Sequence, residues 1–183
     1  FGESITDGDR VPPTALLGPD GKPGLLARYF NPVTPPVLPF KPGTDRAILA
    51  ALTYQDRPAV TRREVDVAAR AFDLPTVNDY HRTEWTGFLV APETGSYRLG
   101  LGGSGLLEID GHTFLDVGGE HHSPLPTLKT VTLQKGQRYR LRLVSTARGF
   151  GNTDLVWKRI SAQPEADLAA DHIIVEGLTR LAP

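Results

Sequence analysis

The sequence predicts a mainly β protein built as an antiparallel β-sandwich, with a short C-terminal helix and strand after it. Apolar and polar residues alternate with a period of two in several short runs from residue 81 onward, which is typical of strands with one buried face. Turns that contain glycine separate these runs, and few helical patterns lie between them. Many short strands joined in this way indicate a sandwich or a flattened barrel.

The N-terminal part of the chain passes from turn-rich sequence into a first strand. Residues 1–23 are rich in Gly, Pro and Asp, and their apolar periodicity is too weak to predict a stable element, so we interpret them as a linker. The segment 24–30 is the first expected strand. Proline is dense in residues 31–42, which are therefore not expected to pair inside a sheet. Residues 46–54 are expected to form a short surface helix.

The strand that starts near Arg82 is expected to lie at the centre of its sheet. One face carries Trp85 and Leu89, and the other carries Phe88 and Val90, so both faces are apolar. A strand with two apolar faces is typical of a position that is covered on both sides.

Two hairpins are expected further along the chain. Asp110 and Gly111 form a tight-turn signal, because both central residues of a type I′ turn need positive φ. Residues 134–137 are expected to form the second turn. The alternating runs that follow residue 90 predict strands over 97–101, 107–109, 115–117, 131–133, 139–143 and 155–158.

The pattern changes after residue 161. Residues 165–170 are expected to be helical, and residues 171–177 resemble a buried strand. A helix leading into a strand after an all-β region suggests the edge of another domain. The predicted organisation is a linker over 1–23, a sandwich over 24–161 and a segment of a neighbouring domain over 162–183.

The composition excludes several classes of function. The 20 Lys and Arg residues balance 21 Asp and Glu residues, with a formal net charge of −1, so nucleic acid is not an expected partner. No run of about eighteen apolar residues and no secretory signal pattern is found, so we expect no membrane association, and the compartment stays open. The absence of Cys excludes disulfides and thiolate catalysis. The absence of Met indicates a processed, trimmed or excised chain.

Five segments in order carry a resemblance to a known family. They are residues 24–30, 82–97, 107–111, 133–139 and 155–157. Together they resemble the protective-antigen-type (PA14) β-sandwich domain, which occurs in toxins, adhesins and glycosidases as a carbohydrate-binding or substrate-gating insert.

The flanks resemble a particular host of such inserts. Residues 11–16 and 169–178 look like the sequences on either side of the insert in family-3 glycoside hydrolases, chiefly β-glucosidases. The resemblance implies that the host domains of the same polypeptide are partners, and that the substrate is a β-linked glucoside or oligosaccharide. It implies no cofactor, and the chain itself is expected to be non-catalytic.

Candidate catalytic and metal-binding residues are few. Glycoside hydrolysis needs two carboxylates across the scissile bond, and the pair Glu108 and Asp110 is expected to be solvated instead. The adhesins of the family bind calcium through Asp residues before the matching strand, but residues 102–105 contain no carboxylate, so no metal is expected there. A second set of metal-ligand types is expected to be a surface loop: Asp116, Glu120, His121 and His122.

Two other patterns have a structural and a functional interpretation. Arg138, Arg140 and Arg142 share one strand face, which is more simply a solvated face than a docking surface. Trp85 and Trp157 are in phase with apolar neighbours, so we expect both in the core rather than stacked on a sugar.

The best candidate for substrate contact is the loop that follows Arg148. Phe150 has Gly on both sides and interrupts no strand pattern, with Arg148 and Asn152 as polar neighbours. An exposed aromatic residue is costly unless something covers it, and loops of the resembled inserts reach over the host's active-site mouth. The alternative is a loop tucked against its own sandwich. Residues 31–57 form a longer connection than the family resemblance leads us to expect. This segment either gates the same active-site mouth or forms a plain surface loop.

Two further functions remain open. A freestanding carbohydrate-binding or adhesin module would have a polar tail, whereas residues 173–175 are apolar and favour a neighbouring sheet. If the domain were only a structural spacer, shortening the loop around Phe150 and residues 31–57 would leave the activity of the whole protein unchanged.

Overall fold

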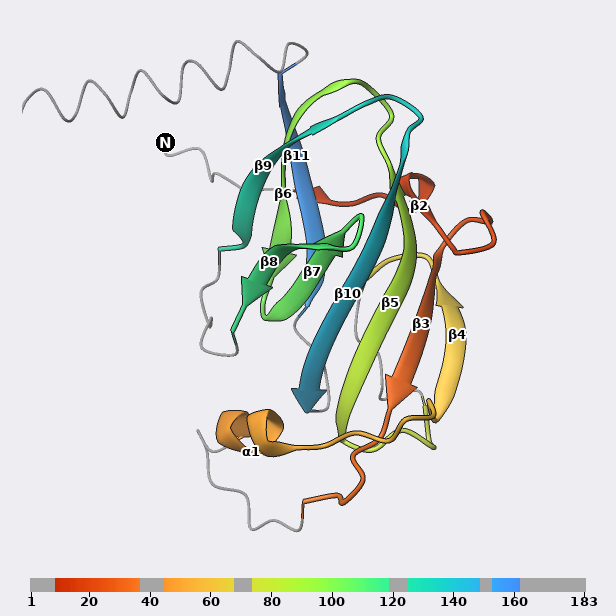
Figure 1. Ribbon diagram of the computed structural model, residues 1–183, viewed down its shortest axis with the longest axis vertical. Helices are drawn as coiled ribbons and strands as arrows, with labels where there is room; N and C mark the ends of the chain where they lie inside the picture. The colour runs from red at the N-terminus through yellow and green to blue at the C-terminus, as the bar shows by residue number, and fades with distance from the viewer. Residues whose placement is uncertain (1–8, 37–44, 68–73, 119–124, 149–152, 162–183) are drawn as a thin grey trace, which may run out of the picture.

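The chain folds as two antiparallel β-sheets packed face to face (Figure 1), which confirms the predicted sandwich. This computed structural model describes residues 9–36, 45–67, 74–118, 125–148 and 153–161. The smaller sheet has the order β1 (Asp9–Arg10), β11 (Asp154–Ser161), β6 (Gly95–Gly102) and β9 (Thr127–Leu133). The larger sheet has the order β4 (Val60–Glu64), β3 (Leu25–Phe30), β5 (Tyr80–Val90), β10 (Arg138–Arg148), β7 (Gly105–Ile109) and β8 (His112–Val117), and β2 (Leu16–Leu17) also pairs with β5.

Strand β5 is central, as predicted. It pairs with β10 along its whole length and with β3 and β2 on its other side. The side of β5 that faces the smaller sheet carries Trp85 and Leu89, both fully buried, while Phe88 and Val90 on the outer side are half-buried. Gly87 has no room for a side chain, because a Cβ there would overlap the carbonyl oxygen of Leu17 in β2.

The core lies between the two sheets and is mostly leucine and aromatic. Trp85 is fully buried and Trp157 nearly so, which confirms that both tryptophans pack in the core. The ring of Trp157 lies 5.1 Å from that of Tyr97, in a tilted arrangement that aromatic pairs favour. The fully buried leucines include Leu16, Leu25, Leu89, Leu99, Leu101, Leu107, Leu133, Leu141 and Leu143.

Part of the expected N-terminal linker belongs to the sandwich. Residues 9–17 form β1, a 3-10 helix over Pro13–Ala15 and β2, and Val11, Ala15 and Leu16 are buried. The expectation of no stable element before residue 24 is therefore wrong for this stretch. The reason is physical: β1 and β2 have two residues each and take their stability from neighbours far along the chain, so they show no local periodicity.

The two expected hairpins have different outcomes. Asp110 and Gly111 have φ of 52° and 84° between β7 and β8, which confirms the first hairpin. The second is wrong, because β9 pairs with β6 in the smaller sheet while β10 pairs with β5 and β7 in the larger one. The turn at residues 134–137 therefore crosses between the sheets. Alternation could not reveal this, since both strands point their apolar side into the same core.

Of the remaining expected elements, one is observed and the others lie outside the described residues. The helix expected over 46–54 is α1 (Asp45–Ala51). The helix and strand expected within 162–183 lie outside the described residues, as does the start of the N-terminal linker. Within the described part of the chain, the helices are too short or too polar to reach across a lipid bilayer.

Candidate functional site

One end of the larger sheet gathers the residues of greatest functional interest. There β3 ends at Phe30, β5 begins at Tyr80 and β10 ends at Arg148. We call this the β10 end; it is the lower end in Figure 1. The strand register places Phe30 opposite Arg82, and Arg148 opposite Tyr80.

Arg148 is the candidate contact residue that the structure describes. Its Nε lies 3.1 Å from an Asp79 carboxylate oxygen, and its guanidinium lies 5.4 Å from the centre of the Tyr80 ring. The ion pair and the ring together hold the side chain at the β10 end. Phe150 and Asn152 lie outside the described residues, so their expected position beside Arg148 stays a prediction.

Thr153, the first described residue after Phe150, is anchored to the turn between β6 and β7. Thr153 donates a hydrogen bond of 2.7 Å to the Ser104 carbonyl oxygen, and its hydroxyl lies 2.6 Å from that of Ser145. Both side chains are almost fully buried. Residues 102–105, which lack the carboxylates of a calcium site, therefore support the start of β11.

The residues considered for metal binding do not assemble a site in the described part of the chain. No group of three His, Asp or Glu side chains there could hold an ion. Asp116 is exposed on β8, whereas Glu120, His121 and His122 lie outside the described residues.

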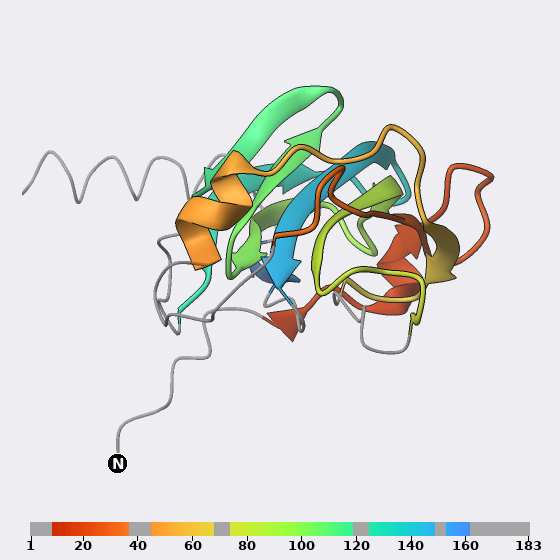
Figure 2. The same ribbon diagram turned by 90° about the horizontal axis from the view of Figure 1, so that it is seen from below.

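The described parts of the excursion over residues 31–57, which are residues 31–36 and 45–57, lie at the same end of the sheet. Its two arms run side by side, since Val33 N donates to Thr53 O and Gln55 N donates to Asn31 O, each at 2.9 Å. The Asn31 side chain fastens one arm by accepting a 2.7 Å bond from Asn78 N. Helix α1 contacts β10, and Figure 2 shows α1 and the stretch that follows it over one face of the larger sheet.

The excursion contacts Arg82, an arginine that no sequence motif marks. The Arg82 guanidinium lies 4.4 Å from the centre of the Phe30 ring and 5.4 Å from that of Tyr54. Burial raises the pKa of the Tyr54 hydroxyl, and the charge of Arg82 opposes this shift. Tyr54 is distant from Arg82 in sequence, so no local motif signals the contact.

A buried polar cluster lies on the inner face of the same strands. A Glu64 carboxylate oxygen accepts hydrogen bonds from the Tyr29 hydroxyl at 2.6 Å and Arg62 Nε at 2.7 Å, and the other accepts from Trp85 Nε1 at 2.6 Å. Burial, and then the bond to Glu64, raise the pKa of Tyr29 far above its usual range. Both Glu64 oxygens accept from donors on three strands, so the cluster joins β3, β4 and β5.

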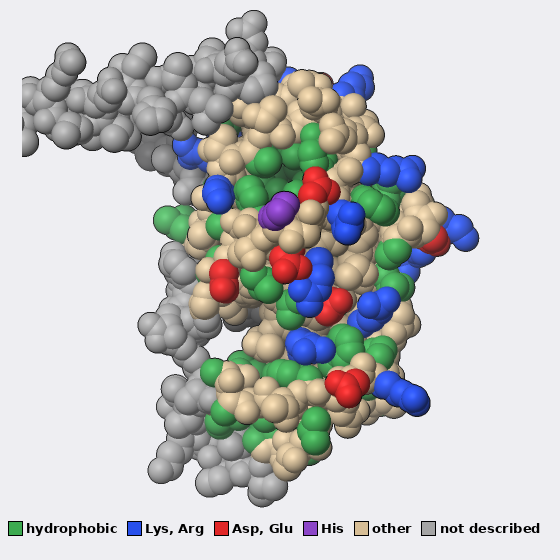
Figure 3. Space-filling view, in the orientation of Figure 1, with side chains coloured by type: hydrophobic (Ala, Val, Ile, Leu, Met, Phe, Trp, Pro, Cys, Tyr) green, Lys and Arg blue, Asp and Glu red, His purple; other side chains and the backbone are tan. Residues whose placement is uncertain are grey.

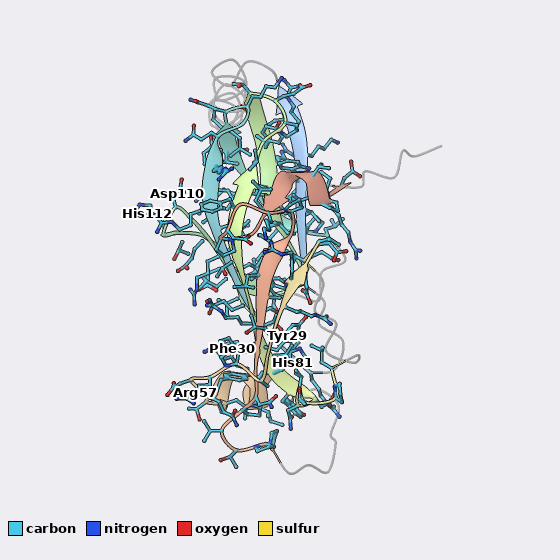
Figure 4. All side chains as sticks on the ribbon, turned by 90° about the vertical axis from the view of Figure 1, so that its right-hand side faces the viewer. Tyr29, Phe30, Arg57, His81, Asp110 and His112 are labelled. Atoms are coloured by element: carbon cyan, nitrogen blue, oxygen red, sulfur yellow. The ribbon has the colours of Figure 1, made fainter. Side chains whose placement is uncertain are left out.

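His81 lies beside this cluster. Its side chain is fully buried, its ring lies 6.0 Å from that of Tyr29, and its Nε2 has no hydrogen-bond partner in the described part of the chain. Burial lowers the pKa of its imidazole. Figure 4 shows Tyr29 and His81 on one side of the sheet and Phe30 and Arg57 on the other.

The outer face of the larger sheet carries charges of alternating sign. Arg142 donates to Glu108 at 2.8 Å and to Glu84 at 3.2 Å, and Arg28 lies 4.0 Å from Glu84. The hydrogen bonds to Glu84 and then Glu108 raise the pKa of Arg142. Figure 3 shows basic and acidic side chains interspersed over this face.

This network also places the carboxylate pair considered for catalysis. Glu108 binds Arg142, whereas Asp110 sits in the exposed turn and accepts a 2.7 Å bond from Arg140 N. The two carboxylates thus serve different structural contacts. Of the arginine stripe, Arg138 and Arg140 are exposed and Arg142 is partly exposed.

Comparison with known proteins decides the family. The sequence model of the PA14 domain matches residues 21–167. The chain belongs to the PA14 domain family. The resemblance in the sequence is thereby confirmed, and the two-sheet sandwich of this PA14 domain agrees with it. Sequence comparison with curated proteins gives no match.

Solved structures share this PA14 fold at low sequence identity. The GH31 α-xylosidase from Xanthomonas citri has 17% identity and a TM-score of 0.60, with 84% of this chain and 16% of that one covered. The β-glucosidase from Kluyveromyces marxianus in complex with glucose has 17% identity and a TM-score of 0.54, covering 86% and 18%. An anti-sigma factor domain-containing protein from Clostridium clariflavum has 17% identity and a TM-score of 0.51, covering 87% and 46%. The chain thus spans less than a fifth of either glycosidase.

Proposed function

We propose that this PA14 domain is a non-catalytic part of a glycoside hydrolase of the β-glucosidase type, and that its β10 end shapes the entrance to the host's substrate site. Residues 1–8 and 162–183 would then lead to the host domains of the same polypeptide. The substrate would be a β-linked glucoside or oligosaccharide.

The single observation that carries the proposal is the meeting of two segments at one end of the sandwich. Arg148, which begins the Phe150 loop, and the excursion over residues 31–57 both lie at the β10 end, where α1 contacts β10. Loops carried on a rigid sheet are a common way to build a binding surface. The fold neighbours support the choice of host, because two of them are glycosidases of which a PA14-like region is a small part.

The described carboxylates support a non-catalytic role. Glycosidases need one carboxylate as an acid and another as a nucleophile or base, facing each other across the bond. Glu64 is held by three donors inside the sheet, and Glu84 and Glu108 share Arg142. Each of these carboxylates is already engaged in holding strands together.

The test uses the polypeptide that contains this domain in its source organism. Its intact mass should be several times that of this chain, and it should hydrolyse aryl β-glucosides. Phe150→Ala, Arg148→Ala and Asn152→Ala should then change the ratio of kcat/KM for a bulky and a small aglycone by several-fold, because they alter the space beyond the scissile bond.

A matched control is Arg98→Ala, since Arg98 is exposed on β6 in the other sheet. It should leave the aglycone ratio unchanged. A polypeptide no larger than this chain, without hydrolase activity, would contradict the proposal and favour a freestanding carbohydrate-binding module. Unchanged aglycone ratios in an active hydrolase would instead indicate a structural spacer.

A further inference from the structure

The outer surface of the β10 end contains a cation that no described residue neutralises. The Arg82 side chain makes no hydrogen bond or ion pair with any described residue, although its guanidinium lies against the rings of Phe30 and Tyr54. Its Nε is buried and has no hydrogen-bond partner among the described residues, and the same holds for the Tyr54 hydroxyl oxygen. A buried polar group without a partner is rare and costly, so this arrangement needs a physical reason.

The geometry prepares the guanidinium for a ligand. The two rings restrict the plane of the guanidinium, which reduces the entropy lost on binding. Nη1 and Nη2 are not among the buried atoms that lack a partner, and they make no bond in the described part of the chain, so both are accessible. A flat guanidinium with two accessible terminal nitrogens matches the two oxygens of a carboxylate.

The surrounding charges favour an anion at this position. Glu84, two residues along the same strand face, is already bound to Arg142 and lies near Arg28. Asp79 is bound to Arg148. The carboxylates nearest to Arg82 in the sequence, Asp79 and Glu84, are therefore compensated, whereas no described residue compensates the charge of Arg82.

We propose that Arg82, with Phe30 and Tyr54, forms a binding site for the carboxylate of an acidic saccharide such as a uronic acid. The carboxylate accepts hydrogen bonds from Nη1 and Nη2 of Arg82, and the rings of Phe30 and Tyr54 hold the guanidinium in place. The carboxylate part rests on the geometry of Arg82 alone. The saccharide part rests on the proposed role in a glycosidase.

The experiment titrates the purified protein with methyl β-glucuronide, acetate and methyl β-glucoside, and follows the Arg82 Nε–H signal by NMR. That proton is buried and lies beside two rings, so its resonance should be resolved. The glucuronide should shift it with a Kd on the order of 1 mM, as expected for one exposed bidentate pair. Acetate should bind more weakly, and the neutral glucoside should leave the signal in place.

Variants separate the site from non-specific attraction. Arg82→Gln should abolish binding of the glucuronide, and Arg82→Lys should weaken it at least several-fold because the planar fork is lost. Tyr54→Ala, which removes one of the two rings beside the guanidinium, should weaken it less. Arg140→Gln is the matched control, since Arg140 is exposed on the same face of the sheet at a distance from Phe30. Its binding should equal that of the wild type.

Each outcome has a defined meaning. No shift with the glucuronide, or an equal loss in Arg140→Gln, would overturn the site. Equal binding of acetate and the glucuronide would keep the carboxylate site and overturn the saccharide assignment. The hydrolysis assays of the proposed function do not use these ligands, so failure of one proposal leaves the other measurable.

Discussion

Removing the buried Glu64 carboxylate should destabilise the protein strongly. The carboxylate is 8% exposed and accepts bonds from Tyr29, Trp85 and Arg62. In Glu64→Ala, the Tyr29 hydroxyl and the Trp85 N–H stay buried and lose their acceptor. Tyr29 and Trp85 are themselves fully buried, so both donors are shielded from bulk water.

The magnitude follows from the two orphaned donors. Each buried donor without a partner costs about 1–3 kcal/mol, so Glu64→Ala should lower the free energy of unfolding by about 4 kcal/mol. For a domain of this size the melting temperature should fall by about 10 °C. Glu64→Gln keeps one acceptor for Trp85, and the Tyr29 hydroxyl can turn to accept from the amide, so its cost should be about 2 kcal/mol.

The assay is urea unfolding at neutral pH, followed by tryptophan fluorescence, with the slope m compared between variants. Glu108→Ala is the matched control, because Glu108 is partly exposed and bound to Arg142 alone among the described residues; such a pair contributes about 0–1 kcal/mol. The order of destabilisation should be Glu64→Ala, Glu64→Gln, Glu108→Ala. A loss in Glu64→Ala no larger than in the control would refute the reasoning.

Three further predictions follow from single positions. Gly87→Ala should lower the free energy of unfolding several-fold more than Gly118→Ala in the same urea assay. A Cβ at residue 87 would overlap the Leu17 carbonyl, whereas a Cβ at residue 118 would meet open space. Equal losses would contradict the close packing at Gly87. Gly111→Ala should cost about 1 kcal/mol through its φ of 84°, which strains an L residue, and a neutral change by calorimetry would argue against the type I′ turn. Burial lowers the pKa of the His81 imidazole, so the unfolded chain binds a proton at His81 more tightly than the folded protein does. The free energy of unfolding should therefore fall as the pH drops below about 6.5. His81→Gln should flatten that fall in urea titrations, and an unchanged pH profile would refute the role of His81.

Several parts of the fold follow from short-range sequence patterns. The run around Trp85 predicts a central strand because its alternation is visible within a few residues, and the structure confirms it. Asp110 and Gly111 predict their turn because the constraint on φ belongs to those two residues. By contrast, β1 and β2 escape prediction, since two-residue strands depend on partners at β11 and β5.

The sequence predicts one part of the candidate site and not another. Arg148 could be singled out from its place before a glycine-flanked aromatic. Arg82 could not, because it looked like one polar residue in an alternating strand. Its environment comes from Phe30 across the sheet and from Tyr54 in a proline-rich excursion whose path no periodicity describes.

The sequence by itself determined the family, the strands with clear alternation, the first hairpin and the core tryptophans, because each depends on local periodicity, on backbone constraints of single residues or on motif order. Only the tertiary structure decided that β9 and β10 belong to different sheets, that Glu64 is the shared acceptor of three strands and that the excursion folds over Arg82. These features depend on which distant segments meet, and an inward-facing residue looks the same in sequence whichever sheet carries it.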